Sequence, residues 1–201
     1  MKSPASQGKR EQHELVGKRL LLREVRLSDA NGPYLQWMND PEVLKYTESR
    51  FQPYSKERLY QYIETINKNP DYVFRAITLR DTGRHIGNIK LGPIEKDPVG
   101  DLVGDVGFII GAKECWGKGY AAESIRLLAE YAFSSLKLHK LTAGCYTVNI
   151  PAIKTLKKAG FEQLPSSDKP YLSNGKPVDV VNFELLEPNY GQDVRRARKE
   201  G

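Results

Sequence analysis

Glu114-Cys-Trp-Gly-Lys-Gly-Tyr-Ala121 joins a short run of alternating residues to the most regular helical pattern in the chain. The run before it, residues 105–110, predicts a strand, with Val106, Phe108 and Ile110 on one face. Apolar residues recur at helical spacing after it and predict a helix over residues 120–135. Glycines at a helix start let the backbone approach an anion, which the free N–H groups there attract. The segment therefore predicts a phosphate-binding turn, although a simple chain reversal would look the same.

Two familiar phosphate-binding motifs fit this segment poorly. A P-loop needs Ser or Thr after its lysine, but Gly119 follows Lys118. A dinucleotide-binding motif is formally satisfied by Gly117, Gly119 and Ala122, but its first glycine should follow the strand closely and an acid should end the next strand. Six residues separate Ile110 from Gly117, and the next predicted strand ends in Cys-Tyr-Thr-Val. The dinucleotide interpretation is therefore weak.

The rest of the chain predicts a mixed α/β domain with hairpins early and one β-α-β unit late. Ser28 or Asp29 can cap a helix that runs to Met38, and Asn149 can cap a helix that begins at Ile150-Pro151. Asp81-Thr-Gly83 predicts a hairpin turn. Strands are expected over residues 20–25, 72–79, 85–94, 105–110, 140–147 and 178–186 and from Phe161 onward, with a turn at 173–176 and a further helix from Ser55.

Length and composition favour one domain of residues 15–187, between a disordered polar tail (1–14) and a flexible basic tail (188–201). No apolar stretch approaches the ~20 residues that span a bilayer, so we expect no membrane partner. Two isolated cysteines and three scattered histidines predict neither a disulfide framework nor a metal site, and favour a reducing cytoplasm. The net charge of +6 suits a polyanionic ligand such as CoA or even RNA, but also an ordinary solvated surface.

Several motifs together resemble the GNAT superfamily of N-acetyltransferases. The family pattern Gln/Arg-x-x-Gly-x-Gly/Ala appears here as Glu114-x-x-Gly117-x-Gly119. Leu128-Ala-Glu-Tyr-Ala-Phe133, Asn149-Ile-Pro-Ala152 and Lys158-Ala-Gly-Phe161 extend the resemblance, which spans residues 18–187. The branch it is most similar to includes ribosomal-protein N-terminal, spermidine and amino-sugar acetyltransferases. The resemblance implies a mixed, mostly antiparallel central sheet flanked by helices, with a splayed strand pair at the acetyl-CoA site.

The resemblance also implies which residues bind acetyl-CoA. The pantetheine arm would pair with one strand, and the pyrophosphate would meet backbone N–H groups of the glycine-rich loop. Asn149 would touch the pantetheine arm, with Ala152 one turn further on, although Asn149 can equally act as a plain N-cap. The implied residues are Phe108, Ile109 and Ile110 of the strand, and Trp116, Gly117, Lys118, Gly119, Tyr120 and Ala121 of the loop.

Attack of an amine on a thioester needs a base for the ammonium proton. Asp105 is the first candidate and Glu123 the second, although an acid at Glu123 also complements the helix dipole. Many family members carry a tyrosine proton donor seven residues after the asparagine, where this chain has Leu156. Tyr146, Cys145 and Thr155 are nearby groups that could donate instead; alternatively the thiolate leaves unaided at its ordinary pKa.

Glu114 is a second departure from the family pattern, because a negative charge beside a pyrophosphate is unfavourable unless it points away.

The expected activity is acetyl transfer from acetyl-CoA to a primary amine, with a protein N-terminus favoured. An amino sugar, an aminoglycoside or a polyamine is the alternative acceptor, and the basic body argues mildly against a polyamine, which would want an acidic pocket. A non-catalytic CoA-binding or RNA-associated module is the alternative class. We expect no nucleic-acid partner and a monomer or homodimer. The family places the acceptor pocket between residues 29–49 and 165–177, with Trp37, Tyr46, Phe51, Tyr54 and Tyr171 as candidate walls.

Overall fold

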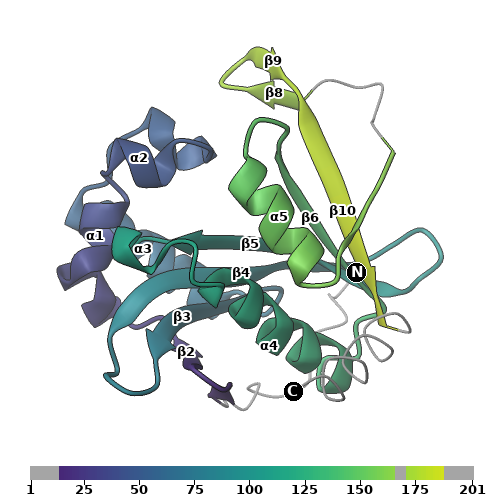
Figure 1. The fold of residues 1–201 in the computed structure, drawn as a ribbon, viewed down its shortest axis with the longest axis horizontal. Coiled ribbons are helices and arrows are strands. Elements are labelled where there is room, and N and C mark those ends of the chain that lie inside the picture. Colours follow the sequence, from purple (N-terminus) through teal and green to yellow (C-terminus); the bar gives the residue numbers. More distant parts are fainter. Residues whose placement is uncertain (1–13, 166–170, 188–201) are drawn as a thin grey trace.

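The computed structural model describes residues 14–165 and 171–187. Within them an eight-stranded sheet has the order β1-β2-β3-β4-β5-β6-β10-β7, and β8 and β9 form a separate hairpin (Figure 1). All strand pairs are antiparallel except β5 with β6, which confirms the mixed, mostly antiparallel sheet flanked by helices. The strands are β1 (Leu15–Val16), β2 (Leu20–Glu24), β3 (Val73–Leu79), β4 (His85–Lys96), β5 (Leu102–Ile110), β6 (Lys140–Tyr146), β7 (Glu162–Gln163), β8 (Tyr171–Ser173), β9 (Lys176–Val178) and β10 (Val180–Leu186).

Strands β5 and β6 pair only at their beginnings. The parallel register joins Val103 to Lys140, Gly104 to Leu141 and Asp105 to Thr142, and no pairing follows. Strand β5 nevertheless continues to Ile110 and β6 to Tyr146, so the two strands diverge beyond Asp105 and Thr142 (Figure 1). The facing edges of the diverging segments carry backbone N–H and C=O groups that are not used between these two strands.

Helix α4 connects β5 to β6 and covers the sheet. Its apolar stripe, which includes Ile125, Leu128 and Ala132, is fully buried. Burial of a side chain such as Leu128 contributes about 1.5–3 kcal/mol, which fixes the helix over β2, β4 and β5. The helical segments are η1 (Leu27–Asn31), α1 (Pro33–Trp37), α2 (Pro41–Leu44), η2 (Glu48–Phe51), α3 (Lys56–Lys68), η3 (Lys113–Cys115), α4 (Tyr120–Ser134) and α5 (Ile150–Lys158).

The first helix differs from its prediction. The prediction of one helix capped by Ser28 or Asp29 was wrong. The structure has two separate segments, η1 and α1, and the N-cap residue of η1 is Arg26. Asp29 lies at the third helical position, where its carboxylate accepts hydrogen bonds from the Arg26 backbone at 2.7 Å and the Arg23 guanidinium at 2.8 Å. The break falls before Pro33, which cannot donate a backbone hydrogen bond and therefore starts a helix rather than continues one.

Other elements follow the predictions more closely. Asn149 caps α5, and the 173–176 turn joins β8 to β9 through Asn174 and Gly175, both with left-handed backbone. The strand expected after Phe161 is only two residues long, and the last strand begins at Val180 because β9 takes residues 176–178. The predicted tails lie outside the described residues apart from Glu14, and so do residues 166–170 of the predicted acceptor wall.

No helix among the described residues is long and apolar enough to cross a membrane.

Candidate active site

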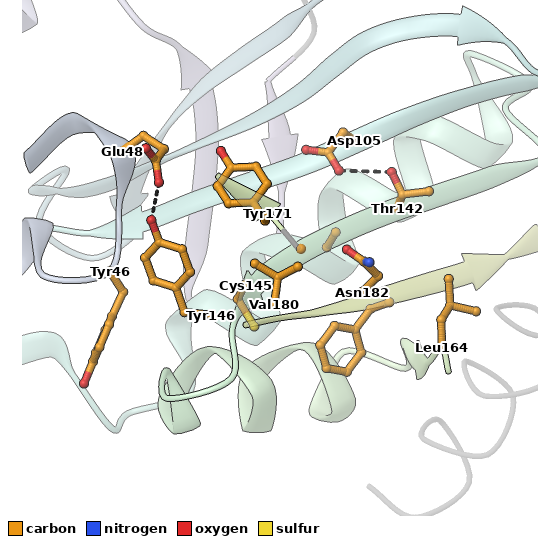
Figure 2. A pocket seen from close by; sticks show the side chains of 13 residues that line it. Tyr46, Glu48, Asp105, Thr142, Cys145, Tyr146, Leu164, Tyr171, Val180 and Asn182 are labelled. Carbon is orange, nitrogen blue, oxygen red and sulfur yellow. Dashed lines mark hydrogen bonds between the residues drawn. The ribbon is translucent and has the colours of Figure 1, made fainter. Parts of the chain in front are cut away.

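A cavity of about 600 Å³ opens where β5 and β6 diverge (Figure 2). Five consecutive residues of β6, from Thr142 to Tyr146, line it, because β5 has moved away from this edge of the strand. Strand β10, which pairs with β6, also contributes lining residues. Glu48 of η2 and Tyr171 of β8 line the cavity from parts of the chain that are far apart in sequence. The lining residues are Tyr46, Glu48, Asp105, Thr142, Ala143, Gly144, Cys145, Tyr146, Leu164, Tyr171, Val180, Asn182 and Phe183.

Asp105 lies at the point where the two strands separate. Thr142, its register partner on β6, donates a hydrogen bond from its hydroxyl to Asp105 Oδ1 at 3.0 Å (Figure 2). The carboxyl keeps contact with solvent through the cavity, yet the protein around it removes enough water for burial to raise its pKa. The Thr142 hydrogen bond and the positive charge of Lys90 oppose this shift, but the pKa of Asp105 remains above its ordinary value.

Glu48, Arg50, Tyr146 and Ser173 form a hydrogen-bonded cluster at the cavity, which we call the clasp. The hydroxyls of Tyr146 and Ser173 both donate to Glu48 Oε1, the latter at 2.9 Å (Figure 2 shows the Tyr146 bond). The Arg50 guanidinium donates to the same two hydroxyl oxygens, at 3.2 Å and 3.1 Å. The clasp thus ties η2 and the β8–β9 hairpin to the end of β6. It also directs the proton of Tyr146, a predicted donor, toward Glu48.

The glycine-rich loop fits a diphosphate. Gly117 and Gly119 have left-handed backbones with φ of 73° and 78°, and a Cβ at Gly117 would meet nothing within 4 Å. Gly119 is the N-cap residue of α4 and offers no side-chain cap, so the first-turn N–H groups are available to an anion. Lys158 Nζ and an Arg19 Nη atom approach Gly119, each within 3.7 Å of the position of an added Cβ. These two cations add to the positive end of the helix dipole.

Glu114 does not add a free negative charge to this loop, because its carboxylate is ion-paired with Arg84. Nearby, the indole N–H of Trp116 donates to the carbonyl oxygen of Ile110 at 2.7 Å and ties the loop to the end of β5. Phe108 and Ile109 lie on the same diverging segment of β5. The side chain of Asn149 accepts a hydrogen bond from the Ala152 backbone at 3.2 Å, so its oxygen serves as the α5 cap.

The two candidate bases are placed differently. Asp105 lines the cavity, whereas Glu123 does not. The carboxylate of Glu123 accepts hydrogen bonds from the Arg19 backbone at 2.8 Å and from Arg19 Nε at 2.7 Å. Glu123 therefore joins the start of α4 to Arg19, just before β2, and of the two candidate bases only Asp105 faces the cavity.

Only some of the predicted proton donors and aromatic wall residues line the cavity. Leu156 is buried and does not line the cavity, whereas Tyr146 and Cys145 do. Burial raises the pKa of the Cys145 thiol, which keeps it protonated. Of the predicted aromatic walls, Tyr46 and Tyr171 line the cavity; Trp37 is a core residue, and Phe51 and Tyr54 are not among the lining residues.

Sequence reasoning did not single out Glu48, Thr142, Ser173 or Asn182 as site residues. Thr142 could have been found only from the β5–β6 register, and Asn182 only from the pairing of β10 with β6. Among the described residues, no group of three or more His, Cys, Asp or Glu side chains could hold a metal ion.

Comparison with known proteins identifies the family. The family model of the acetyltransferase (GNAT) domain matches residues 19–162. The uncharacterized N-acetyltransferase p20 of Bacillus licheniformis is 30% identical over 178 residues, which cover 88% of this chain and 97% of that relative. A GNAT acetyltransferase from Bacillus anthracis superposes with a TM-score of 0.75 at 21% identity, over 88% of this chain and 99% of the other. Spermidine N-acetyltransferase from Vibrio cholerae, solved with CoA and spermine, gives 0.74 at 22% identity, over 87% and 99%. The chain is therefore an acetyltransferase of the GNAT family.

Proposed function

We propose that this enzyme transfers the acetyl group of acetyl-CoA, the donor used by GNAT domains, directly to the α-amine of a protein N-terminus. The observation that carries the proposal is the position of Asp105. It stands where β5 and β6 diverge, in a cavity whose lining also includes hydroxyl and amide groups. A base at this point can take a proton from an amine held in the cavity.

The charge of the cavity suits an incoming ammonium group. Among the described residues, its lining includes two carboxylates, Asp105 and Glu48, and no lysine, arginine or histidine. This local charge is opposite in sign to the net charge of +6 of the whole chain. The basic body therefore gives no reason to disfavour a polyamine. The preference for a peptide depends instead on the neutral hydrogen-bonding groups of the cavity, such as Thr142 and Asn182.

Asp105 would act in its ionised form. The ammonium of the acceptor gives one proton to the carboxylate, and the neutral amine then attacks the thioester carbonyl carbon. A C–N bond forms, the C–S bond breaks, and the sulfur leaves with the bonding electron pair. The nitrogen also loses a second proton as the amide forms, and this proton passes to the thiolate sulfur, either directly or through Tyr146 or Cys145. A raised pKa makes the Asp105 carboxylate a stronger base than an ordinary aspartate.

The acetyl-CoA itself would lie along the diverging segment of β5. Phe108, Ile109 and Ile110 would offer backbone groups to the pantetheine arm. The loop from Trp116 to Ala121 would receive the diphosphate on its N–H groups, with Lys158 and Arg19 beside Gly119 as additional positive charges. Asn149 can give its amide N–H₂ to the arm while its oxygen caps α5.

The test measures free thiol released from acetyl-CoA with three amines: a peptide with a free N-terminus, an amino sugar and spermidine. We expect the peptide to be preferred. Asp105→Asn should lower kcat by about 10²–10⁴-fold, because a general base contributes that much, while the Kd for CoA stays near wild type. Asp101→Asn, an exposed aspartate just before β5, is the matched control. Unchanged kcat in Asp105→Asn would exclude Asp105 as the base, and a preference for spermidine would change the acceptor class.

A further inference from the structure

Asn182 presents an unused amide to the cavity. It lies on β10, is half-buried, and its side chain is on the face of the sheet that carries Thr142 and Gly144 (Figure 2). Among the described residues its amide makes no hydrogen bond to the protein. A half-buried amide that a substrate seals from water without replacing its hydrogen bonds costs about 1–3 kcal/mol. The cavity therefore favours a substrate that offers a donor or an acceptor at this place.

Gly144 gives the Asn182 amide its room. The two residues are direct register partners on β6 and β10. A Cβ at position 144 would stand only 3.2 Å from Asn182 Oδ1, closer than the contact normally allows. The absence of a side chain at Gly144 thus lets the amide oxygen of Asn182 lie over β6 at this residue.

The sheet register places this amide one step beyond the base. Thr142, which holds Asp105, and Gly144, which faces Asn182, are two residues apart on the same face of β6. Two residues of a strand span about 7 Å. Because both Asp105 and Asn182 line the cavity, an amine near Asp105 would have its next few atoms near Asn182. In a protein N-terminus, the first peptide bond occupies that place.

We propose that Asn182 determines acceptor specificity by hydrogen bonding the first peptide bond of the acceptor. An Asn amide has one acceptor oxygen and two donor hydrogens, which complement the N–H and C=O of a peptide bond. Val180 and Leu164, its neighbours in the cavity lining, offer only apolar side chains. This inference rests on the proposed function and names the feature of the substrate that the site reads.

The test compares glycinamide with isobutylamine, two primary amines of nearly the same shape that differ in the amide. Asn182→Leu should lower kcat/KM for glycinamide by about 10–100-fold and leave that for isobutylamine within about threefold, since only one substrate loses a hydrogen-bonding partner. Gly144→Ala displaces the amide without removing it, so it should also lower kcat/KM for glycinamide and not for isobutylamine, but by a smaller factor. Gln163→Leu makes a similar change on exposed β7, outside the cavity, and should affect neither substrate.

Equal losses for both amines in Asn182→Leu, or no loss for either, would overturn the role of Asn182 while the wild-type turnover still supports the proposed function. Two different results would contradict the proposed function itself. Either the wild type would acetylate neither glycinamide nor a peptide, or Asp105→Asn would keep its full kcat. The Kd for CoA, measured by calorimetry in every variant, separates loss of acceptor recognition from misfolding, because a misfolded variant would also lose CoA.

Discussion

Ser173→Ala should release the β8–β9 hairpin from the body of the enzyme. Within the described residues, every side-chain hydrogen bond from this hairpin to the rest of the protein passes through the Ser173 hydroxyl. That hydroxyl is almost fully buried, donates to Glu48 at 2.9 Å and accepts from Arg50 at 3.1 Å. An isolated two-stranded hairpin is marginally stable in water, so its position depends on such contacts.

The magnitude follows from the two charged partners. A hydrogen bond to a charged group contributes about 1.5–3 kcal/mol, but water from the open cavity can replace part of what is lost, and Tyr146 still bonds both Glu48 and Arg50. We expect the hairpin to dock less favourably by about 2 kcal/mol. Since about 1.4 kcal/mol corresponds to a factor of ten, the hairpin should open about 30 times more often.

Hydrogen exchange followed by mass spectrometry measures this directly. Amides of residues 171–178 should exchange about 30-fold faster in Ser173→Ala, while those of β6 keep their wild-type rates. Because Tyr171 lines the cavity, the KM for the acceptor should rise while the Kd for CoA stays unchanged. Ser49→Ala, which removes only a 3.4 Å contact to Tyr54, is the control. Wild-type exchange of the hairpin in a folded Ser173→Ala protein would refute the clasp as its anchor.

Four further predictions concern Asp105, the tight contact at Gly111 and Glu123, the other candidate base. Burial raises the pKa of Asp105, so its contribution to stability is present below the ordinary aspartate pKa and is lost as pH rises through the raised value; Asp105→Asn should therefore melt slightly higher than wild type at pH 7, and an equal or lower Tm would contradict this. The acid limb of kcat/KM, which reports the free enzyme, should likewise lie above the ordinary pKa of aspartate in a pH–rate profile. Gly111→Ala would place a Cβ 1.9 Å from Trp37 Cδ2 and should cost about 1–3 kcal/mol in urea unfolding; a change under about 0.5 kcal/mol would mean that the indole relocates freely. Glu123→Gln should leave kcat within about twofold, because that carboxylate is engaged by Arg19, and a fall of more than 100-fold would restore Glu123 as a base.

Local sequence patterns predicted much of the fold because the relevant physics is local. The spacing of Ile125, Leu128 and Ala132 defines α4, and Asn149 caps α5 as its residue type suggests. The first helix was mispredicted for an equally physical reason. Asp29 has cap chemistry, but its carboxylate is drawn to Arg23 and to the Arg26 backbone, so the helix begins earlier and Pro33 divides it.

The sequence alone determined the glycine pair before a long amphipathic helix and the Asn149 cap, and it placed Asp105 on the strand leading to the loop. Each is specified by residues close together in the chain. Only the tertiary structure decided which side chains share the cavity. Glu48, Tyr171 and Asn182 all line it, although Glu48 and Asn182 are more than a hundred residues apart in the sequence. Their meeting depends on strand register and on the divergence of β5 from β6. The same long-range assembly brings two carboxylates, Asp105 and Glu48, into the described lining of the cavity in a chain of net charge +6, because net charge sums over the whole surface whereas the cavity selects a few residues.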